Sequence, residues 1–379
     1  MRQATNAALM RQNNQKLILD LIRRQPISRA DLAEAIGLTR AAVTMIIDPL
    51  IERGVVVEAD TAEESRVGRK RILLDLDRKN LFALGVYLNR GECRAGVVDF
   101  TGRVLVEERC LTDHSVGQET AIGEILSSLR RMRDGLKLNQ EKIVGIGIAA
   151  PGPLDYRSGV ILNPPKFKFW HNAPIAASLS EGMGLPAWLE NVANATALDE
   201  QYFGVARELS DYAAILIDDG IGSGVVTGGR LYRGARGLGN ELGHTSIQFN
   251  GRRCECGNSG CLEKYASLPA LLERTPFDSW QAVIDGLPSP DANRVLDAAV
   301  QYLGTAFVSL FNLYDLDCVI LKGAMQYKAE ALLQPLNLTL HQRIIHPSRE
   351  TGLVISGCYS NPVRAAAIPA IHAFFQSGE

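Results

Sequence analysis

The sequence predicts an α/β protein of two parts, with a winged helix-turn-helix over residues 1–77 and a two-lobed α/β domain over residues 78–379. Three observations predict this division. The first part contains two short helical segments joined at a glycine, and the second contains one strand–turn–strand pattern twice. A chain of 379 residues is also too long for one ordinary core.

Composition excludes several classes of protein. Apolar residues make up 46% and charged residues 22% of the chain, which are values typical of a folded, water-soluble protein. We find no membrane-spanning stretch and no secretory signal, so we expect a cytoplasmic protein whose seven cysteines are reduced or bound to metal. Residues 1–80 carry 14 Lys and Arg against 11 Asp and Glu, whereas the whole chain has a net charge of −2. Only the N-terminal part is therefore suited to a polyanion.

Residues 28–52 carry the helix-turn-helix pattern. A first helix is predicted over residues 28–36, with Ser28 as N-cap and Asp31 three residues later. Gly37 ends this helix, and a second helix starts at Thr39 with its apolar residues at core spacing. Because proline breaks a helix interior, Pro49 predicts that the second helix kinks or ends near Asp48.

The flanking segments complete a winged domain. Residues 8–24 are amphipathic and predict a further helix, and residues 54–77 alternate like two strands around a charged tip, the wing. In such a domain the second helix enters the major groove and the wing contacts phosphates. The predicted base-reading residues are Thr39, Arg40, Ala42 and Thr44, and the predicted phosphate contacts are Arg69, Lys70 and Arg71. The alternative is a three-helix interaction module whose basic loop is simply solvated.

The remainder of the chain repeats one plan. Residues 81–100 and 212–231 each read as an apolar strand, a glycine-containing turn and a second strand, and helical stretches follow at 119–137 and 292–312. This duplication predicts two α/β lobes that face a cleft, although a single doubly wound sheet also fits the periodicity. At the end of a strand, Glu190 and Asn191 are candidate ligand-binding residues. Asn191 is also well suited to cap the following helix.

Four residues form the strongest chemical signal. His244, Cys254, Cys256 and Cys261 have the spacing His-x9-Cys-x-Cys-x4-Cys, and glycines at 257 and 260 permit a tight loop. Four such ligands predict one structural zinc ion per chain in a closed tetrahedral site. Redox-active thiols are the alternative, but the loop lacks a Cys-x-x-Cys pair.

Two carboxylates adjoin this loop. Glu241 lies three residues before His244, and Glu263 lies two residues after Cys261. Together they are suited to accept hydrogen bonds from the hydroxyl groups of a polyol, although either is also compatible with a plain surface acid.

The run from Gly239 to Glu263, GNELGHTSIQFNGRRCECGNSGCLE, resembles the signature of the ROK family of repressors and sugar kinases. The resemblance covers nearly the whole chain and implies an actin-like ATPase or ribonuclease-H-like sugar-kinase fold. A helix-turn-helix before two lobes is the plan of the family's repressors. The resemblance places Asn191, Glu241, His244 and Glu263 in sugar-contacting positions, assigns the four zinc ligands, and implies a homodimer or higher homo-oligomer.

Departures from the family's kinases indicate a chain without kinase activity. Where those kinases carry Glu-Asn-Asp, this chain reads Glu-Asn-Val, so Val192 replaces the general base and cannot accept a proton. The first phosphate turn has lost its acidic residue and its first glycine, and Asp218 and Asp219 place negative charge in the second. We therefore expect a DNA-binding transcriptional repressor that responds to a sugar-like effector and binds operator DNA. The alternatives are a ROK-type sugar kinase with an accessory DNA-binding domain and a non-enzymatic scaffold.

One basic residue bears on the charge of that effector. Lys166 stands where the family commonly has asparagine, so an anionic sugar derivative bound between the lobes is one prediction. The alternative is that Lys166 and Lys168 flank Phe167 and Phe169 on an exposed loop.

Overall fold

The structure is a computed structural model that describes residues 7–59, 72–89, 92–110, 117–164, 167, 170–345, 353–358 and 361–377. The chain forms two compact units. The first comprises Met1–Ala150, Arg157–Leu189 and Pro362–Glu379, and the second comprises Pro151–Tyr156 and Glu190–Asn361. The first unit holds both the N-terminal domain and the first lobe, so the predicted boundary at residues 77 and 78 stays a prediction. Among the described residues, no helix is long and apolar enough to cross a membrane.

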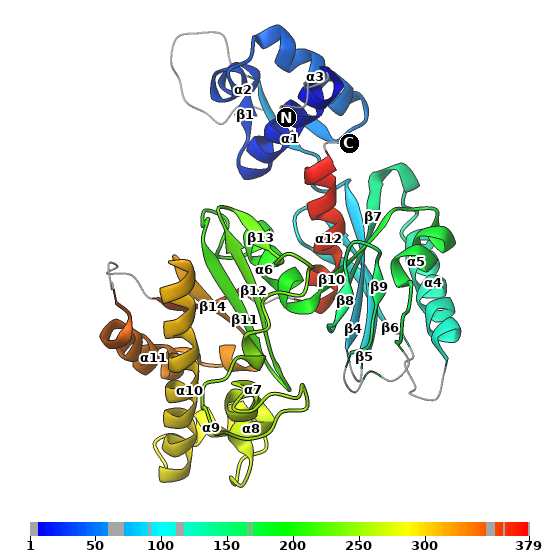
Figure 1. The fold of residues 1–379 in the computed structure, drawn as a ribbon. Coiled ribbons are helices and arrows are strands. Elements are labelled where there is room, and N and C mark those ends of the chain that lie inside the picture. Colours follow the sequence, from blue (N-terminus) through cyan, green and yellow to red (C-terminus); the bar gives the residue numbers. More distant parts are fainter. Residues whose placement is uncertain are drawn as a thin grey trace. The chain divides into compact units, whose positions relative to one another are not determined.

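The N-terminal domain is the predicted winged helix-turn-helix (Figure 1). Its helices are α1 (Ala7–Arg24), α2 (Arg29–Ile36) and α3 (Arg40–Glu52), and its strands β1 (Ile27–Ser28), β2 (Val56–Ala59) and β3 (Leu73–Leu76) pair in the order β1-β3-β2. Ser28 and Thr39 cap α2 and α3, accepting from the amides of Asp31 and Ala42. Gly37 ends α2 at φ 67°, in the left-handed region that favours glycine.

The sequence predicted that α3 kinks or ends near Asp48, and an end there is wrong, because the helix continues through Pro49 to Glu52. Proline lacks the N–H that would bond the carbonyl four residues earlier, which is that of Met45. Arg11 Nη2 of α1 lies 3.5 Å from this carbonyl oxygen, at the long limit of a hydrogen bond. The last turn is also anchored by Leu50, which is 1% exposed. Burial of this side chain favours continued helix over the break that proline alone would cause.

The wing is described only at its base. Strands β2 and β3 are antiparallel, as the alternation over residues 54–77 predicts, and Val56 lies opposite Leu76. The predicted phosphate contacts Arg69, Lys70 and Arg71 lie outside the described residues.

The first lobe contains a five-stranded sheet in the order β10-β7-β4-β5-β6. Its strands are β4 (Phe82–Asn89), β5 (Glu92–Asp99), β6 (Val104–Cys110), β7 (Ile143–Ala150) and β10 (Ala187–Asn191). The short strands β8 (Leu154–Asp155) and β9 (Val160–Ile161) pair in a separate two-stranded sheet. Helix α12 (Pro362–Ser377) covers one face, and α4 (Gln118–Gly135) and α5 (Ile175–Met183) cover the other (Figure 1). A 3-10 turn, η1 (Gln140–Lys142), leads into β7.

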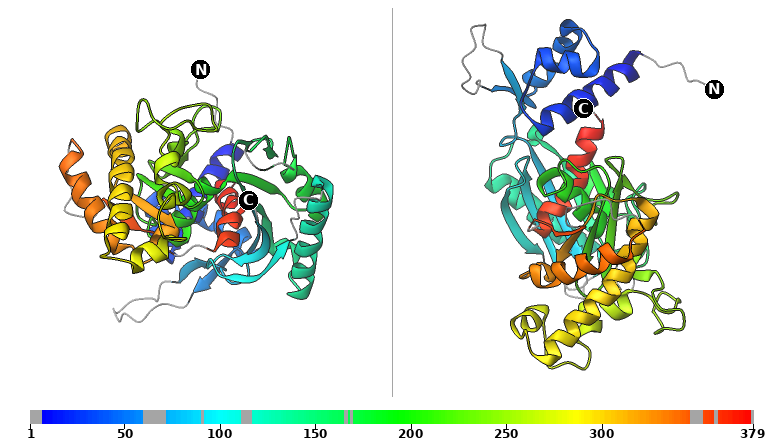
Figure 2. Two further views of the ribbon diagram at one scale, coloured as in Figure 1. Left: turned by 90° about the horizontal axis from the view of Figure 1, so that it is seen from below. Right: turned by 90° about the vertical axis from the view of Figure 1, so that its left-hand side faces the viewer.

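The second lobe contains another five-stranded sheet, in the order β13-β12-β11-β14-β15. Its strands are β11 (Tyr212–Ile217), β12 (Ile221–Thr227), β13 (Arg230–Tyr232), β14 (Cys318–Gly323) and β15 (Val354–Ser356). Its helices are α6 (Val192–Phe203), α7 (Glu263–Ala266), α8 (Leu268–Leu272), α9 (Trp280–Asp285), α10 (Pro290–Tyr314) and α11 (Glu330–Arg343), with 3-10 turns η2 (Leu242–His244) and η3 (Ala324–Gln326). The long helix α10 packs beside α11 (Figure 2).

The two sheets share one topology, which confirms the duplication expected from the sequence and excludes a single doubly wound sheet. In each sheet the repeated strand pair is antiparallel, β4 with β5 and β11 with β12. A later strand then adds in parallel on the other side, β7 beside β4 and β14 beside β11. The predicted helices at 119–137 and 292–312 correspond to α4 and α10.

Candidate functional site

The start of α6 is fixed by its own polar side chains. Asn191 is the N-cap, and its side-chain oxygen accepts from the amide of Ala193 at 2.8 Å, so the capping alternative is realised. Glu190 is 3% exposed, and its carboxylate accepts from Asn194 Nδ2 at 2.9 Å and pairs with Arg233 at 2.8 Å. Glu190 thus links α6 to the segment around Arg233 through its carboxylate.

A pocket of about 400 Å³, part of it open solvent, lies in front of this helix start within the second unit. Its lining residues come from four segments: Gly152, Pro153 and Leu154; Asn191 and Asn194; Gly222 and Ser223; and residues 237–241. Asn191 and Glu241, predicted from distant parts of the sequence, both line it. A side-chain carbon at Gly152 would lie 3.1 Å from Asn191 Nδ2 and 3.8 Å from Glu241 Oε1, so this glycine keeps both groups accessible.

The pKa of the Glu241 carboxylate is raised by its surroundings. Glu241 as a whole is exposed, yet the protein around its carboxylate removes enough water to raise its pKa above the ordinary value. His244 opposes this shift in pKa, and the negative charge of Glu263 adds to it. Glu263 does not line the pocket, and its Oε2 accepts from the amide of Ile221 at 3.0 Å. Lys166 lies outside the described residues.

The pocket also contains polar residues that the sequence did not single out. Asn240 adopts φ 69°, and its Nδ2 donates to Asn194 Oδ1 at 3.2 Å and to the carbonyl of Tyr232 at 2.5 Å. The hydroxyl of Ser223 donates to the Asn240 carbonyl at 2.5 Å. The only feature of the sequence that could have indicated these polar pocket residues is the spacing of Asn191 and Asn194, which lie three positions apart at the start of one helix.

The four predicted metal ligands converge beside Glu241. Their donor atoms all lie within 4.8 Å of one another. Cys256 Sγ and Cys261 Sγ are 3.7 Å apart, and Cys254 Sγ is 3.6 Å from His244 Nδ1. Tetrahedral zinc, with bonds of about 2.3 Å to sulfur and about 2.0 Å to nitrogen, requires edges of about 3.8 and 3.5 Å. The arrangement therefore fits a zinc ion, with all four ligand positions supplied by the protein.

The ligand loop is tied to the pocket through its backbone. The amide of His244 donates to the carbonyl of Glu241 at 3.0 Å, and the amide of Leu262 donates to the carbonyl of Thr245 at 3.0 Å. Gly260, at φ 76°, has no room for a side-chain carbon because the Gln248 carbonyl occupies that place. A metal held by the loop would thus fix the position of Glu241 at one end and Glu263 at the other.

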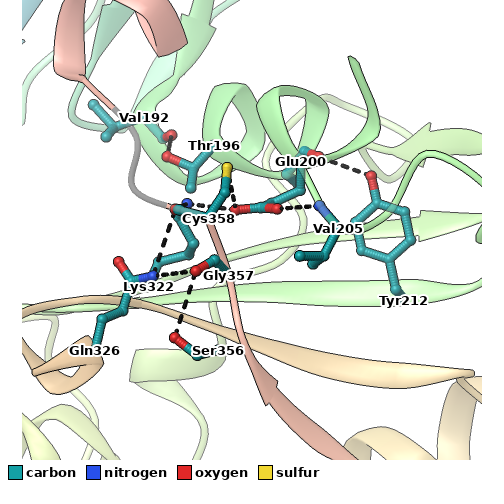
Figure 3. Close-up of polar contacts among 11 residues, drawn as sticks. Val192, Thr196, Glu200, Val205, Tyr212, Lys322, Gln326, Ser356, Gly357 and Cys358 are labelled. Carbon is teal, nitrogen blue, oxygen red and sulfur yellow. Dashed lines mark hydrogen bonds and ion pairs between the residues drawn. The ribbon is translucent and has the colours of Figure 1, made fainter. Parts of the chain in front are cut away.

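The far end of α6 is anchored by a buried ion pair (Figure 3). Glu200 is 0% and Lys322 2% exposed, and Lys322 Nζ lies 2.5 Å from Glu200 Oε1 and 2.5 Å from the carbonyl of Cys358. The other carboxylate oxygen accepts from the amide of Val205 at 2.9 Å. Nearby, burial strongly raises the pKa of Tyr212, whose hydroxyl donates to the carbonyl of Ala197. Both charges of the pair are thus satisfied within the second lobe.

The outer face of α3 holds the predicted base-reading residues. Thr39 and Arg40 are exposed, and Ala42 and Thr44 are half-buried. The Thr39 hydroxyl oxygen accepts from the amide of Ala42 at 3.2 Å and so also serves as the helix cap. Two further residues of this face, Ala41 and Met45, are exposed and were not predicted.

Comparison with known proteins covers both parts of the chain. The sequence model of the ROK family matches residues 84–361, and that of a winged helix-turn-helix DNA-binding domain matches residues 11–57. The xylose repressor of Caldicellulosiruptor bescii is 29% identical over 359 residues, which cover 89% of this chain and 90% of the relative. The N-acetylglucosamine repressor of Escherichia coli O6:H1 is 27% identical over 364 residues, which cover 92% and 89%.

A solved structure shares the complete plan. It is described as a ROK family transcriptional regulator homologous to the MLC protein of E. coli, and it is 25% identical to this chain. The match covers 97% of both chains with a TM-score of 0.83. The similarity therefore includes the N-terminal domain as well as the two lobes.

Proposed function

The chain belongs to the ROK family, and from this membership we propose that it is a DNA-binding transcriptional repressor controlled by a sugar or sugar derivative. The observation that carries the proposal is the joining of a winged helix-turn-helix, with an exposed face on α3, to two lobes, the second of which contains a polar pocket. Its relatives include repressors named for xylose and for N-acetylglucosamine, so the sugar class is better supported than any one sugar.

The pocket chemistry supports a hydroxyl-rich effector. The Asn191 amide can donate to a ligand hydroxyl while its oxygen caps α6, and the Glu241 carboxylate can only accept once ionised. We propose these two as direct contacts, with His244 and Glu263 beside them and Glu190 as a support. A contact from Lys166 to an anionic group, and binding between the lobes, stay predictions.

We further propose that the chain does not transfer phosphate. At the first position of α6, Val192 offers no proton acceptor beside the pocket. Asp218 follows β11, and its carboxylate accepts from the amide of Ala324, just after β14, at 3.0 Å. This backbone donor is therefore already used, and the carboxylate adds negative charge next to it. Such a charge repels a nucleotide phosphate.

Zinc is the metal that the ligand set favours, with one ion per chain in a structural role. All four positions come from protein, so the proposed metal stabilises the loop and leaves no site for a reacting water. We also propose that the protein forms a homodimer or higher homo-oligomer, which would place two α3 helices on a roughly two-fold symmetric operator. We propose the cytoplasm as its location, since a regulator that binds operator DNA acts there.

The test of the proposal uses the full-length protein and a library of random DNA duplexes. We expect enrichment of a roughly symmetric sequence, and release of that duplex by one or more members of a sugar panel. Arg40→Ala should weaken binding to the selected duplex more than to random DNA, because a base contact is lost. Glu241→Gln should keep DNA binding but lose the sugar response.

Two results would overturn the proposal. Sugar phosphorylation with ATP, in the absence of any enriched duplex, would favour the kinase alternative. DNA release by sugar that is unchanged in both Glu241→Gln and Asn191→Ala would place the effector site elsewhere.

The proposed metal has its own test. Elemental analysis of protein purified without chelator should give one zinc per chain, and Cys256→Ser should lower both metal content and melting temperature.

A further inference from the structure

A large apolar side chain projects from the outer face of α3. Met45 is 69% exposed, more than any other large hydrophobic residue among the described residues of the N-terminal domain. The core side of the same helix is formed by Val43, Ile46 and Ile47, which are at most 5% exposed. Packing of the domain therefore gives no reason for a methionine at this position.

Met45 lies among the residues expected to read bases. On an α-helix, positions three and four apart share a face, so Met45 shares a face with Ala41 and with Ala42, which is one of the predicted base-reading residues. Because α3 continues past Pro49 to Glu52, Met45 has seven helical residues after it and does not lie at a fraying end. Its side chain is therefore presented from the middle of a formed helix.

We propose that Met45 is a specificity-determining residue that contacts the 5-methyl group of a thymine in the major groove. The thymine methyl is the apolar group that base edges present there, and the other contacts on offer are hydrogen-bond donors and acceptors. The methionine side chain is long, flexible and apolar, so it can cover a methyl group while Arg40 and Thr44 bond neighbouring edges. This inference rests on the proposed DNA-binding function.

The experiment uses full-length protein and the duplex that it enriches from the random library. Each thymine of that duplex is replaced in turn by uracil, which removes the methyl group and leaves the pairing edge unchanged. Wild-type protein should lose about fourfold in affinity at one thymine per half-site, the effect of one buried methyl group. Met45→Ala should bind the thymine and uracil duplexes equally at that position, because no side chain remains to cover the methyl.

A matched control comes from α1. Met10 is also an exposed methionine, 54% accessible, but lies outside α3, so Met10→Ala should keep the wild-type uracil effect. An equal uracil effect in wild type and Met45→Ala, or no uracil effect in wild type at any position, would overturn the inference while leaving the regulator proposal intact. Failure to enrich any duplex would overturn both.

Discussion

Helices α12 and α6 pack against their sheets in the same way, but the buried side chains of α12 are apolar and many of those of α6 are polar. Each lies close to strand glycines: a side-chain carbon at Gly147 would collide with the carbonyl of Ala366 in α12, and one at Gly224 with the carbonyl of Ala193 in α6. The buried side chains of α12 are apolar, ending in Phe374 and Phe375. Those of α6 include Asn194, Thr196, Asp199 and Glu200.

This difference between the two helices indicates which of the two equivalent positions in the duplicated fold supports a binding site. A buried apolar helix needs only complementary shape, so α12 serves the architecture of the first lobe. A buried polar helix needs a partner for each polar group, and those partners come from distant segments. The partners of α6 organise the pocket at one of its ends and the Lys322 ion pair at the other.

The largest expected effect comes from breaking the buried ion pair. Glu200→Ala leaves the Lys322 ammonium buried without a counter-charge, which should lower the free energy of unfolding by about 3–5 kcal/mol. Urea denaturation measures this change. The double variant Glu200→Gln with Lys322→Met removes both charges and should recover most of the loss. A change below about 1 kcal/mol in Glu200→Ala would mean that the pair does not anchor α6.

The next effect tests whether the two helices have different roles. Gly147→Ala and Gly224→Ala should each lower stability by about 1–3 kcal/mol, since the added methyl group overpacks a helix–sheet contact. Only Gly224→Ala should also weaken effector binding, because α6 carries Asn191. The control is Gly123→Ala inside α4, where the added carbon meets nothing within 4 Å and should stabilise slightly. Equal loss of effector affinity in both lobe variants would contradict the comparison.

The smallest effect separates the structural role of Asn191 from its binding role. Asn191→Ala should cost about 1 kcal/mol of stability, because the Ala193 amide loses its capping acceptor. Asn191→Ser restores a capping oxygen and should regain that stability, while calorimetry should still show weakened effector binding. If the serine variant regains effector affinity as well, Asn191 acts on the pocket only through the cap.

Much of the fold and part of the site could be predicted from the sequence, because those features depend on residues near one another in the chain. The caps at Ser28 and Thr39 each use an amide three residues later, and the metal ligands lie within one short stretch. The two strands of each repeated pair are only a few residues apart in the sequence and carry their own apolar pattern. Local spacing was therefore enough to predict the winged domain, the two lobes and the gathering of one histidine and three cysteines that could hold a metal ion.

Tertiary structure decided what depends on distant partners. Glu190, predicted only as a candidate ligand contact, forms an ion pair with Arg233 across 43 residues, and Lys322 meets Glu200 across 122. The course of α3 past Pro49 is favoured by the burial of Leu50, a contribution that is made by the packing of the domain. Each of these interactions joins residues that only the arrangement of sheets and helices brings together, and the order of residues along the chain carries no direct signal of that meeting.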